Sequence, residues 1–148
     1  MRNEVVATFN GRRVVAIDSI SLITLDNEGA VVVCGSHGGA ISGAFAAKHP
    51  PALVIFNDAG GGKNDAGIAA LALLELEGIA AAAVSHESAR IGDALDAWEN
   101  DIVTHVNASA AEAGISTGET LREAVGCFMP KRYQRPPPLA TLVGGQYR

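Results

Sequence analysis

A unit of buried strand, polar loop and helix occurs three times in succession, and it constrains the fold of this chain more than any other feature. Its strands are short apolar runs without polar alternation, which is typical of strands covered on both faces. Consecutive units of this kind form parallel strands joined by right-handed crossovers. The sequence therefore predicts a three-layer α/β fold with a small, mainly parallel sheet. We expect the strands at residues 30–34, 53–56 and 79–84, and the helices at 40–48, 66–77 and 88–113.

The N-terminal part of the chain predicts a β-hairpin at one edge of that sheet. Residues 5–9 and 13–17 have strand composition and flank Asn10 and Gly11. This residue pair best tolerates the positive φ angles of a two-residue hairpin turn. Residues 19–24, which follow the hairpin, fit a strand or a short helix equally well.

Capping residues indicate where two of the helices begin. Asn64 or Asp65 can accept hydrogen bonds from the free amides in the first turn of the second predicted helix. Ser116 and Glu119 form a capping-box pattern, in which each side chain satisfies an unpaired amide of the other residue. We therefore expect a last helix that runs from this box to about Cys127.

The composition changes at the C-terminal end of the chain. The 148 residues, 48% of them hydrophobic, suffice for one domain with its own core. All 16 acidic side chains precede residue 130, whereas the segment 130–148 is basic and contains three consecutive prolines. We expect a single α/β domain at 1–129 and an arm at 130–148 that covers an acidic surface of this or a neighbouring subunit, or is disordered. Residues 139–143 could add a strand. The basic residues of the arm are Lys131, Arg132, Arg135 and Arg148.

Charge and hydropathy exclude several classes of protein. A net charge of −5 without a basic stripe argues against nucleic acid as a partner. The longest apolar run is far shorter than a membrane span, and the first residues lack the apolar stretch of a signal peptide. Two cysteines are too few for a disulfide scaffold. We expect a soluble, cytoplasmic protein without a membrane partner, and a homo-oligomer, because so small a sheet with an alanine-rich exterior readily shares its surfaces.

Polar side chains gather where the three predicted strands end. Ligands of an open parallel sheet bind beyond the carboxyl ends of its strands, so this edge is the expected site. The opposite edge has ordinary turn composition. The expected catalytic residues are Ser36, His37, Asp58 and His86, and the expected substrate-binding residues are Gly38, Gly39, Asn57, Lys63, Ser85, Ser88 and Arg90.

The catalytic candidates allow more than one chemistry. Ser36, Asp58 and His86 follow the order of an acyl-hydrolase triad, although Cys34 replaces the first glycine of the nucleophile motif. His37 and His86 could instead act as general acid and base, bind a divalent metal together with a carboxylate, or be structural. The sequence has no His-x-x-x-His or Cys-x-x-Cys spacing to support a metal site, so no cofactor is predicted. Binding of a divalent metal remains an open alternative.

Glycines and cations at the same edge suit an anionic ligand. Gly38 and Gly39 offer backbone amides at a helix N-terminus, which attract anions. Lys63 follows three glycines, but their spacing does not match a phosphate-binding P-loop. Arg90 could neutralise Asp58 or bind a substrate carboxylate or phosphate in a bidentate manner.

Other residues have simpler expected roles. Cys34 ends a buried strand and is expected as a small core residue rather than as a nucleophile. Trp98 fits the core or a subunit interface, and His49 and His105 (the latter on the long predicted helix) are expected to be structural or exposed.

Together these observations predict an enzyme that acts on a small polar, anionic metabolite by hydrolysis or lyase-type chemistry. Hydride transfer does not fit, because no dinucleotide-binding glycine motif follows a strand. The alternative is a non-catalytic small-molecule-binding or regulatory subunit that uses the same crevice. A third hypothesis is an assembly role of the basic arm.

Overall fold

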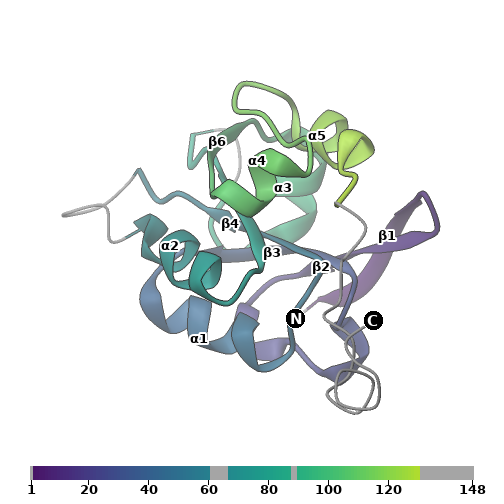
Figure 1. Ribbon diagram of the computed structural model, residues 1–148. Helices are drawn as coiled ribbons and strands as arrows, with labels where there is room; N and C mark the ends of the chain where they lie inside the picture. Colours follow the sequence, from purple (N-terminus) through teal and green to yellow (C-terminus); the bar gives the residue numbers. More distant parts are fainter. Residues whose placement is uncertain (1, 61–66, 88–89, 131–148) are drawn as a thin grey trace, which may run out of the picture.

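A six-stranded mixed sheet forms the centre of the molecule (Figure 1), with strands in the order β1-β2-β3-β4-β5-β6. The computed structural model describes residues 2–60, 67–87 and 90–130. Strands β2 to β5 are parallel, and β1 and β6 are antiparallel to their neighbours at the two edges. The predicted α/β fold class and the N-terminal edge hairpin are thus confirmed. The strands are β1 (Asn3–Phe9), β2 (Arg12–Ile17), β3 (Val31–His37), β4 (Leu53–Asn57), β5 (Ala80–Val84) and β6 (Val103–Val106).

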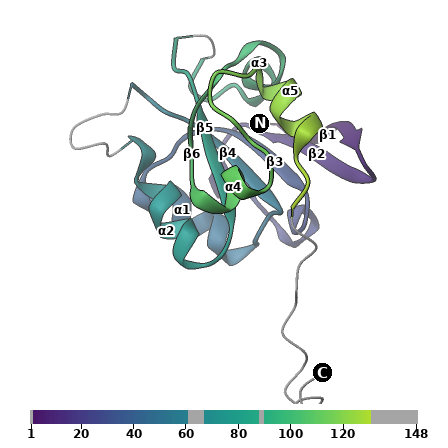
Figure 2. The ribbon, with the colours of Figure 1, turned by 45° about the horizontal axis from the view of Figure 1, so that its top comes forward.

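Helices cover both faces of this sheet, which makes three layers (Figure 2). One face packs against α1 (Ala40–Lys48), α2 (Ala69–Leu76) and the 3-10 turn η1 (Ile20–Leu22), with η2 (Leu25–Asn27) following it. The other face packs against α3 (Ala94–Asn100), α4 (Ala108–Glu112) and α5 (Leu121–Cys127). None of the helices in the described part of the chain has the length and apolar character needed to cross a bilayer.

Successive residues of each parallel strand enter opposite halves of the core. In β4, Val54 and Phe56 face α1 and α2, while Leu53 and Ile55 face α3 to α5. Trp98 is almost fully buried in the second half, where its ring meets that of Phe9 edge-on at 5.9 Å. Of the two roles expected for Trp98, the structure therefore shows the core role.

The long helix predicted at 88–113 is wrong. The chain instead forms α3, then the edge strand β6, then α4. Asp93 accepts a hydrogen bond from the Asp96 amide and begins α3, and Asn107 accepts one from the Ala110 amide and begins α4. Val103, His105 and Val106, between the two helices, pair with β5, because tertiary pairing outweighs the helical spacing of apolar residues. His105 consequently lies on a strand.

Two predicted helix starts are also wrong. The capping box of α5 consists of Thr120 and Glu123, one turn after the expected one, although the Ser116 amide does donate to the Glu119 carboxylate at 3.2 Å. Helix α2 begins at Ala69, three residues after the predicted start, with Ile68 as its N-cap, and Asn64 and Asp65 lie outside the described residues.

Other local expectations have clear outcomes. Asn10 and Gly11 have positive φ angles of 52° and 78°, as the hairpin turn requires. The ambiguous residues 19–24 form the turn η1 rather than a strand. The strand considered at 139–143, like the arm beyond Pro130, lies outside the described residues.

One buried side chain joins three segments, α2, β5 and α4. The Asn107 amide nitrogen donates to the carbonyls of Leu71 and Ile79 at 3.2 and 2.9 Å. Its oxygen accepts from the amides of Ala81 and Ala110, both at 3.0 Å. With 8% of the residue exposed, water cannot replace these partners, so Asn107 fixes α2, β5 and α4 to one another.

We predict that Asn107→Ala lowers the free energy of unfolding by about 3 kcal/mol, because it leaves buried amides and carbonyls without partners. Urea unfolding followed by circular dichroism measures this change. Asn100→Ala is the matched control, since its amide makes one exposed hydrogen bond, to Asp96, and should cost at most about 0.5 kcal/mol. Equal losses in the two variants would contradict the role of Asn107.

Candidate functional site

A buried carboxylate, Asp58, lies where β4 ends, at the edge that the sequence predicts for the site. Only 6% of this residue is exposed. Its Oδ1 accepts a hydrogen bond from the Gly60 amide at 2.8 Å, so the chain turns sharply back over the carboxylate. Ala59 and Gly60 adopt positive φ angles of 52° and 74° in this turn. The turn thereby fixes the direction of Asp58 toward the ends of β5 and β6.

His86 is held by this carboxylate. The Asp58 Oδ1 accepts hydrogen bonds from the backbone amide and from ring Nδ1 of His86, both at 3.1 Å. Gly60 lies beneath the ring, and a Cβ there would stand 3.4 Å from His86 Cε1. The side chain of His86 is nevertheless 45% exposed. The imidazole is therefore fixed on one side and open to solvent on the other.

The pKa of Asp58 determines which nitrogen of His86 carries the proton. Burial acts to raise this pKa, but the hydrogen bonds from Gly60, Thr104 and His86 outweigh it, and the pKa lies below its usual value. An ionised carboxylate only accepts hydrogen bonds, so Nδ1 of His86 must be the donor. In the neutral ring Nε2 then carries the lone pair, as in a histidine prepared to accept a proton from a substrate or water.

Two further residues of this hydrogen-bond network are not among the site residues predicted from the sequence. The Thr104 hydroxyl donates to Asp58 Oδ2 at 2.8 Å, and ring Nδ1 of His105 lies 3.0 Å from the Thr104 oxygen. Both residues belong to β6, which the sequence places in a helix. Without that strand, no pattern in the sequence brings them to Asp58. The β-branched residues Val103, Thr104 and Val106 are the signal that could have indicated a strand.

Ser36 is not hydrogen-bonded to the Asp58–His86 pair. Its Oγ accepts a hydrogen bond from the Ile20 amide at 3.0 Å, on the side of β3 that faces η1. Strand β3 is two positions from β5, which is about 10 Å across the sheet. Of the three groups of the triad hypothesis, the structure brings together the carboxylate and the imidazole but not the hydroxyl.

His37 is the last residue of β3 and is exposed. It pairs in register with Asn57, which pairs in turn with Val84. The ends of β3, β4 and β5 therefore lie level, as the prediction of a shared edge requires. Asn57 is buried, and its side-chain oxygen accepts from the Ala59 amide at 2.8 Å, which supports the turn rather than facing solvent.

The glycines after β3 have a packing role. The Gly38 amide donates to the Asn57 carbonyl at 3.2 Å, so the expectation that it is free for an anion is wrong. A Cβ at Gly38 would stand 2.9 Å from the Gly67 carbonyl oxygen. Gly39 is the N-cap of α1 and is buried. Gly38 is thus required because α2 approaches β3 closely at this point.

Two of the remaining candidates, Ser85 and Arg90, lie in the described part of the segment that follows β5. Ser85 Oγ accepts from the Glu87 amide at 3.0 Å, which orders the turn after β5. Arg90 is exposed, and its backbone amide donates to Asp96 at 2.9 Å. Asp58 is paired with His86 and Thr104, so Arg90 does not neutralise it. Lys63 and Ser88 lie outside the described residues.

A second carboxylate, Asp18, closes the edge next to β2. Its Oδ2 accepts from the Arg2 amide at 2.8 Å and its Oδ1 from the Ala94 amide at 3.1 Å. Burial acts to raise the pKa of Asp18, but these amides and the positive charge of Arg2 lower it overall. Asp18 therefore joins β2 to the start of α3 and has a structural role that the sequence analysis did not consider.

The structure also bears on Cys34 as a nucleophile and on the alternative that the histidines bind a metal ion. Burial raises the pKa of the Cys34 thiol to about 12, so the thiolate needed by a nucleophile does not form near neutral pH. Among the described residues, no group of three or more histidine, cysteine, aspartate or glutamate side chains is arranged to hold a metal ion.

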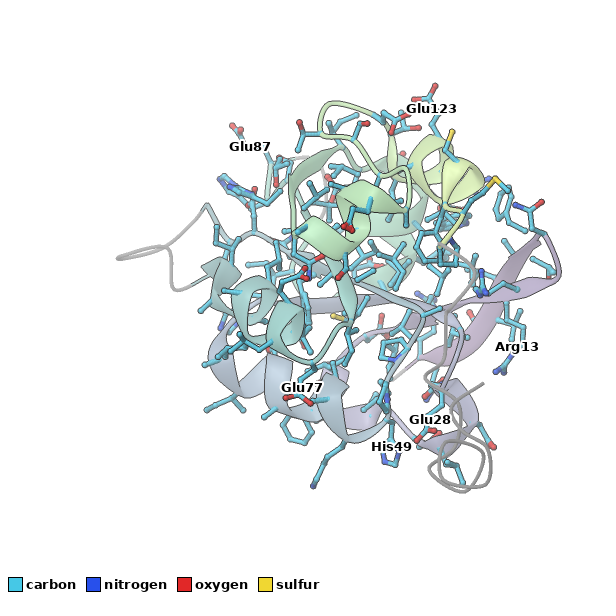
Figure 3. The ribbon with its side chains drawn as sticks, in the orientation of Figure 1. Arg13, Glu28, His49, Glu77, Glu87 and Glu123 are labelled. Carbon is cyan, nitrogen blue, oxygen red and sulfur yellow. The ribbon has the colours of Figure 1, made fainter. Side chains whose placement is uncertain are left out.

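Two hollows lie near the ends of the strands. One, of about 570 Å³, lies between α2 and β6 and is lined by Leu71, Thr104 and His105 among others. A larger one, of about 970 Å³, lies at the amino ends of the parallel strands, where Gly29, Pro50 and Ile79 contribute to its walls. Of these two hollows, only the smaller one shares residues with the Asp58 network, namely Thr104 and His105, and we therefore place the candidate site at the carboxyl edge. Figure 3 shows the two edges of the sheet: Glu87 lies at the carboxyl edge, and Glu28, His49 and Glu77 lie at the opposite edge.

Comparisons of this chain with protein-family models, with curated proteins and with solved structures found no match.

We predict that Asp58 contributes to the pH dependence of stability. A carboxyl whose pKa is lower in the folded state stabilises the protein above its unfolded pKa of about 3.9, and this contribution is lost as the pH falls through the folded pKa. Asp58→Asn should therefore be less stable at pH 7 and should lose less stability on acidification below about pH 4.

Urea unfolding over this pH range measures both effects. Asp26→Asn is the control, because Asp26 is exposed and offers only its backbone carbonyl, to Arg13. An acid limb in Asp58→Asn as steep as that of the wild type would show that Asp58 does not contribute.

Proposed function

We propose that this protein is an enzyme that acts on a small polar, anionic metabolite by hydrolysis or lyase-type chemistry, with His86 as its proton-transferring group. The observation that carries the proposal is the hydrogen bond from His86 Nδ1 to the buried, ionised Asp58. It orients an imidazole whose other side is open to solvent, and that geometry prepares a general base.

The first step in such an enzyme would be removal of a proton by Nε2 of His86, from a water molecule in hydrolysis or from a substrate carbon in elimination. Asp58 would stabilise the imidazolium that forms, because it already accepts the Nδ1 proton. His37, exposed at the end of β3 and two strands from β5, is the candidate for the acid that returns a proton to the leaving group. Ser36 would not be the nucleophile.

Cations near the same edge support an anionic substrate. Arg90 is exposed in the segment between β5 and α3, and its planar guanidinium suits a carboxylate or phosphate. The sequence places Lys63 in the loop after β4, and Ser85 and Ser88 in the segment after β5. In a protein with a net charge of −5, such cations would supply the local positive potential that an anion requires.

We predict that His86→Gln lowers kcat by a factor of about 100 or more, the usual contribution of a general base. Small carboxylates and phosphates are first screened for thermal stabilisation of the wild type, and every compound that binds is then incubated and analysed for products, with and without EDTA. The wild type should convert at least one compound, and His86→Gln should bind it without converting it.

His49→Gln is the matched control. His49 contacts Glu28 at the same 3.1 Å but lies at the opposite edge of the sheet, so this variant should keep full activity. Binding without turnover by the wild type would favour the alternative, a regulatory small-molecule-binding subunit. Full activity of His86→Gln would remove the assignment of the base.

We also infer that the protein works in the cytoplasm as a homo-oligomer. Three large apolar side chains, Ile41 of α1 and Leu73 and Leu76 of α2, are exposed on the outer side of one helical layer. Sedimentation equilibrium should give a mass above the 15.2 kDa of one chain. Leu76→Glu should lower that mass if this layer forms the contact, and a monomeric wild type would refute the oligomer.

A further inference from the structure

We propose that Thr104 and His105 are positioning residues for His86, forming with Asp58 a continuous chain of hydrogen bonds that connects the two imidazoles. The inference builds on the proposed function, since it concerns the same proton-transferring group. It rests on three distances: 3.1 Å from His86 Nδ1 to Asp58 Oδ1, 2.8 Å from Thr104 Oγ1 to Asp58 Oδ2, and 3.0 Å from His105 Nδ1 to Thr104 Oγ1.

The hydrogen bonds that connect His105, Thr104 and Asp58 can be assigned in only one direction. The Thr104 hydroxyl has one proton, and two acceptors lie near it, Asp58 Oδ2 at 2.8 Å and the Ala83 carbonyl at 3.3 Å. The shorter contact, to a charged acceptor, takes the proton. The Thr104 oxygen is then an acceptor, so His105 Nδ1 must donate to it. Both imidazoles thus donate toward Asp58, one directly and one through a hydroxyl.

The position of β6 explains why the chain can form. Its pairing with β5 is irregular at this point, since Ala83 pairs with His105 but Val84 pairs with Val103, so Thr104 is the extra residue of a bulge. Bulges redirect side chains and are common beside functional sites. The bulge brings Thr104 to Asp58, while His105 lines the hollow between α2 and β6. The hydrogen bonds therefore connect that hollow with His86.

A hydroxyl that donates to a carboxylate draws negative charge away from it. Without this hydroxyl, Asp58 holds more charge on Oδ1 and stabilises protonated His86 more strongly. His105 has the same effect indirectly. By donating a hydrogen bond to the Thr104 oxygen, it makes the Thr104 hydroxyl a stronger donor to Asp58. Thr104 and His105 thus limit the negative charge that Asp58 Oδ1 presents to His86.

The other ionisable groups nearby are unchanged in the variants that test this. Among the described residues they include His37 at the end of β3, Glu87 and Arg90, which follow His86 in the chain, and Glu75 of α2, which lines the same hollow as His105. Both Glu75 oxygens accept hydrogen bonds from Ser109, at 2.8 and 2.9 Å. A shift in the titration of His86 can then be assigned to the altered residue.

The test is an NMR titration of the imidazole protons in the full-length protein. Thr104→Val keeps the shape of the side chain and removes the hydroxyl, and Thr104→Ser keeps the hydroxyl. We expect the pKa of His86 to rise by roughly 0.5–1 in Thr104→Val and to stay unchanged in Thr104→Ser. His105→Leu should raise it by a smaller amount, whereas His105→Gln, which keeps an N–H donor, should not.

His49 serves as the internal control, because its titration at the far edge should be the same in every variant. An unchanged or lowered pKa of His86 in Thr104→Val would overturn the proposal. If Thr104→Val does not fold, His105→Leu decides, and the absence of any rise there overturns it. The outcome is independent of catalysis: an active His86→Gln enzyme would refute the proposed function and leave this result standing, and the reverse also holds.

Discussion

The carboxylate of Asp58 is the constraint on which the rest of the site depends. Burial makes an unpaired charge at this position costly, so the surrounding chain must supply donors. They come from three places: the turn at Gly60, the backbone and ring of His86, and the hydroxyl of Thr104. Satisfying one buried charge therefore fixes the ends of β4 and β5 relative to β6, and it orients the imidazole in the same step. Stability and candidate chemistry share the same hydrogen bonds.

Close approach of the layers is the second requirement of this edge. Gly35 lies under the turn before α3, where a Cβ would stand 2.6 Å from the Asp18 carbonyl oxygen and from the Gly92 carbonyl carbon. The Gly92 amide donates to the Gly35 carbonyl at 2.7 Å, and Asp18 accepts from Ala94. These contacts hold the segment that carries Arg90 against the end of β3. Gly35 is therefore needed because the turn before α3 packs directly against β3.

Much of the fold could be predicted because its cause is local. The three apolar runs were predicted correctly as β3, β4 and β5. A short, continuous apolar run is typical of a strand whose two faces are both covered, so the pattern itself indicates the element. Asn10 and Gly11 predicted the hairpin for an equally local reason. The long helix at 88–113 failed because the apolar spacing from Ile91 to Ala110 suits a helix, whereas the pairing of β6 with β5 depends on residues far away in the sequence. For the site, Asp58 and His86 were predicted to be neighbours, and the error over β6 concealed Thr104 and His105.

The sequence by itself determined that polar residues gather at one edge of a parallel sheet, because strand polarity and the order of apolar and polar runs are written along the chain. Only the tertiary structure decided which of those residues touch. It joined Asp58 to His86, turned Ser36 toward Ile20 and used the Gly38 amide within the fold. The physical reason is that a hydrogen bond requires its atoms to lie within about 3 Å. Positions are set to that accuracy by the packing of distant segments, which no local pattern contains.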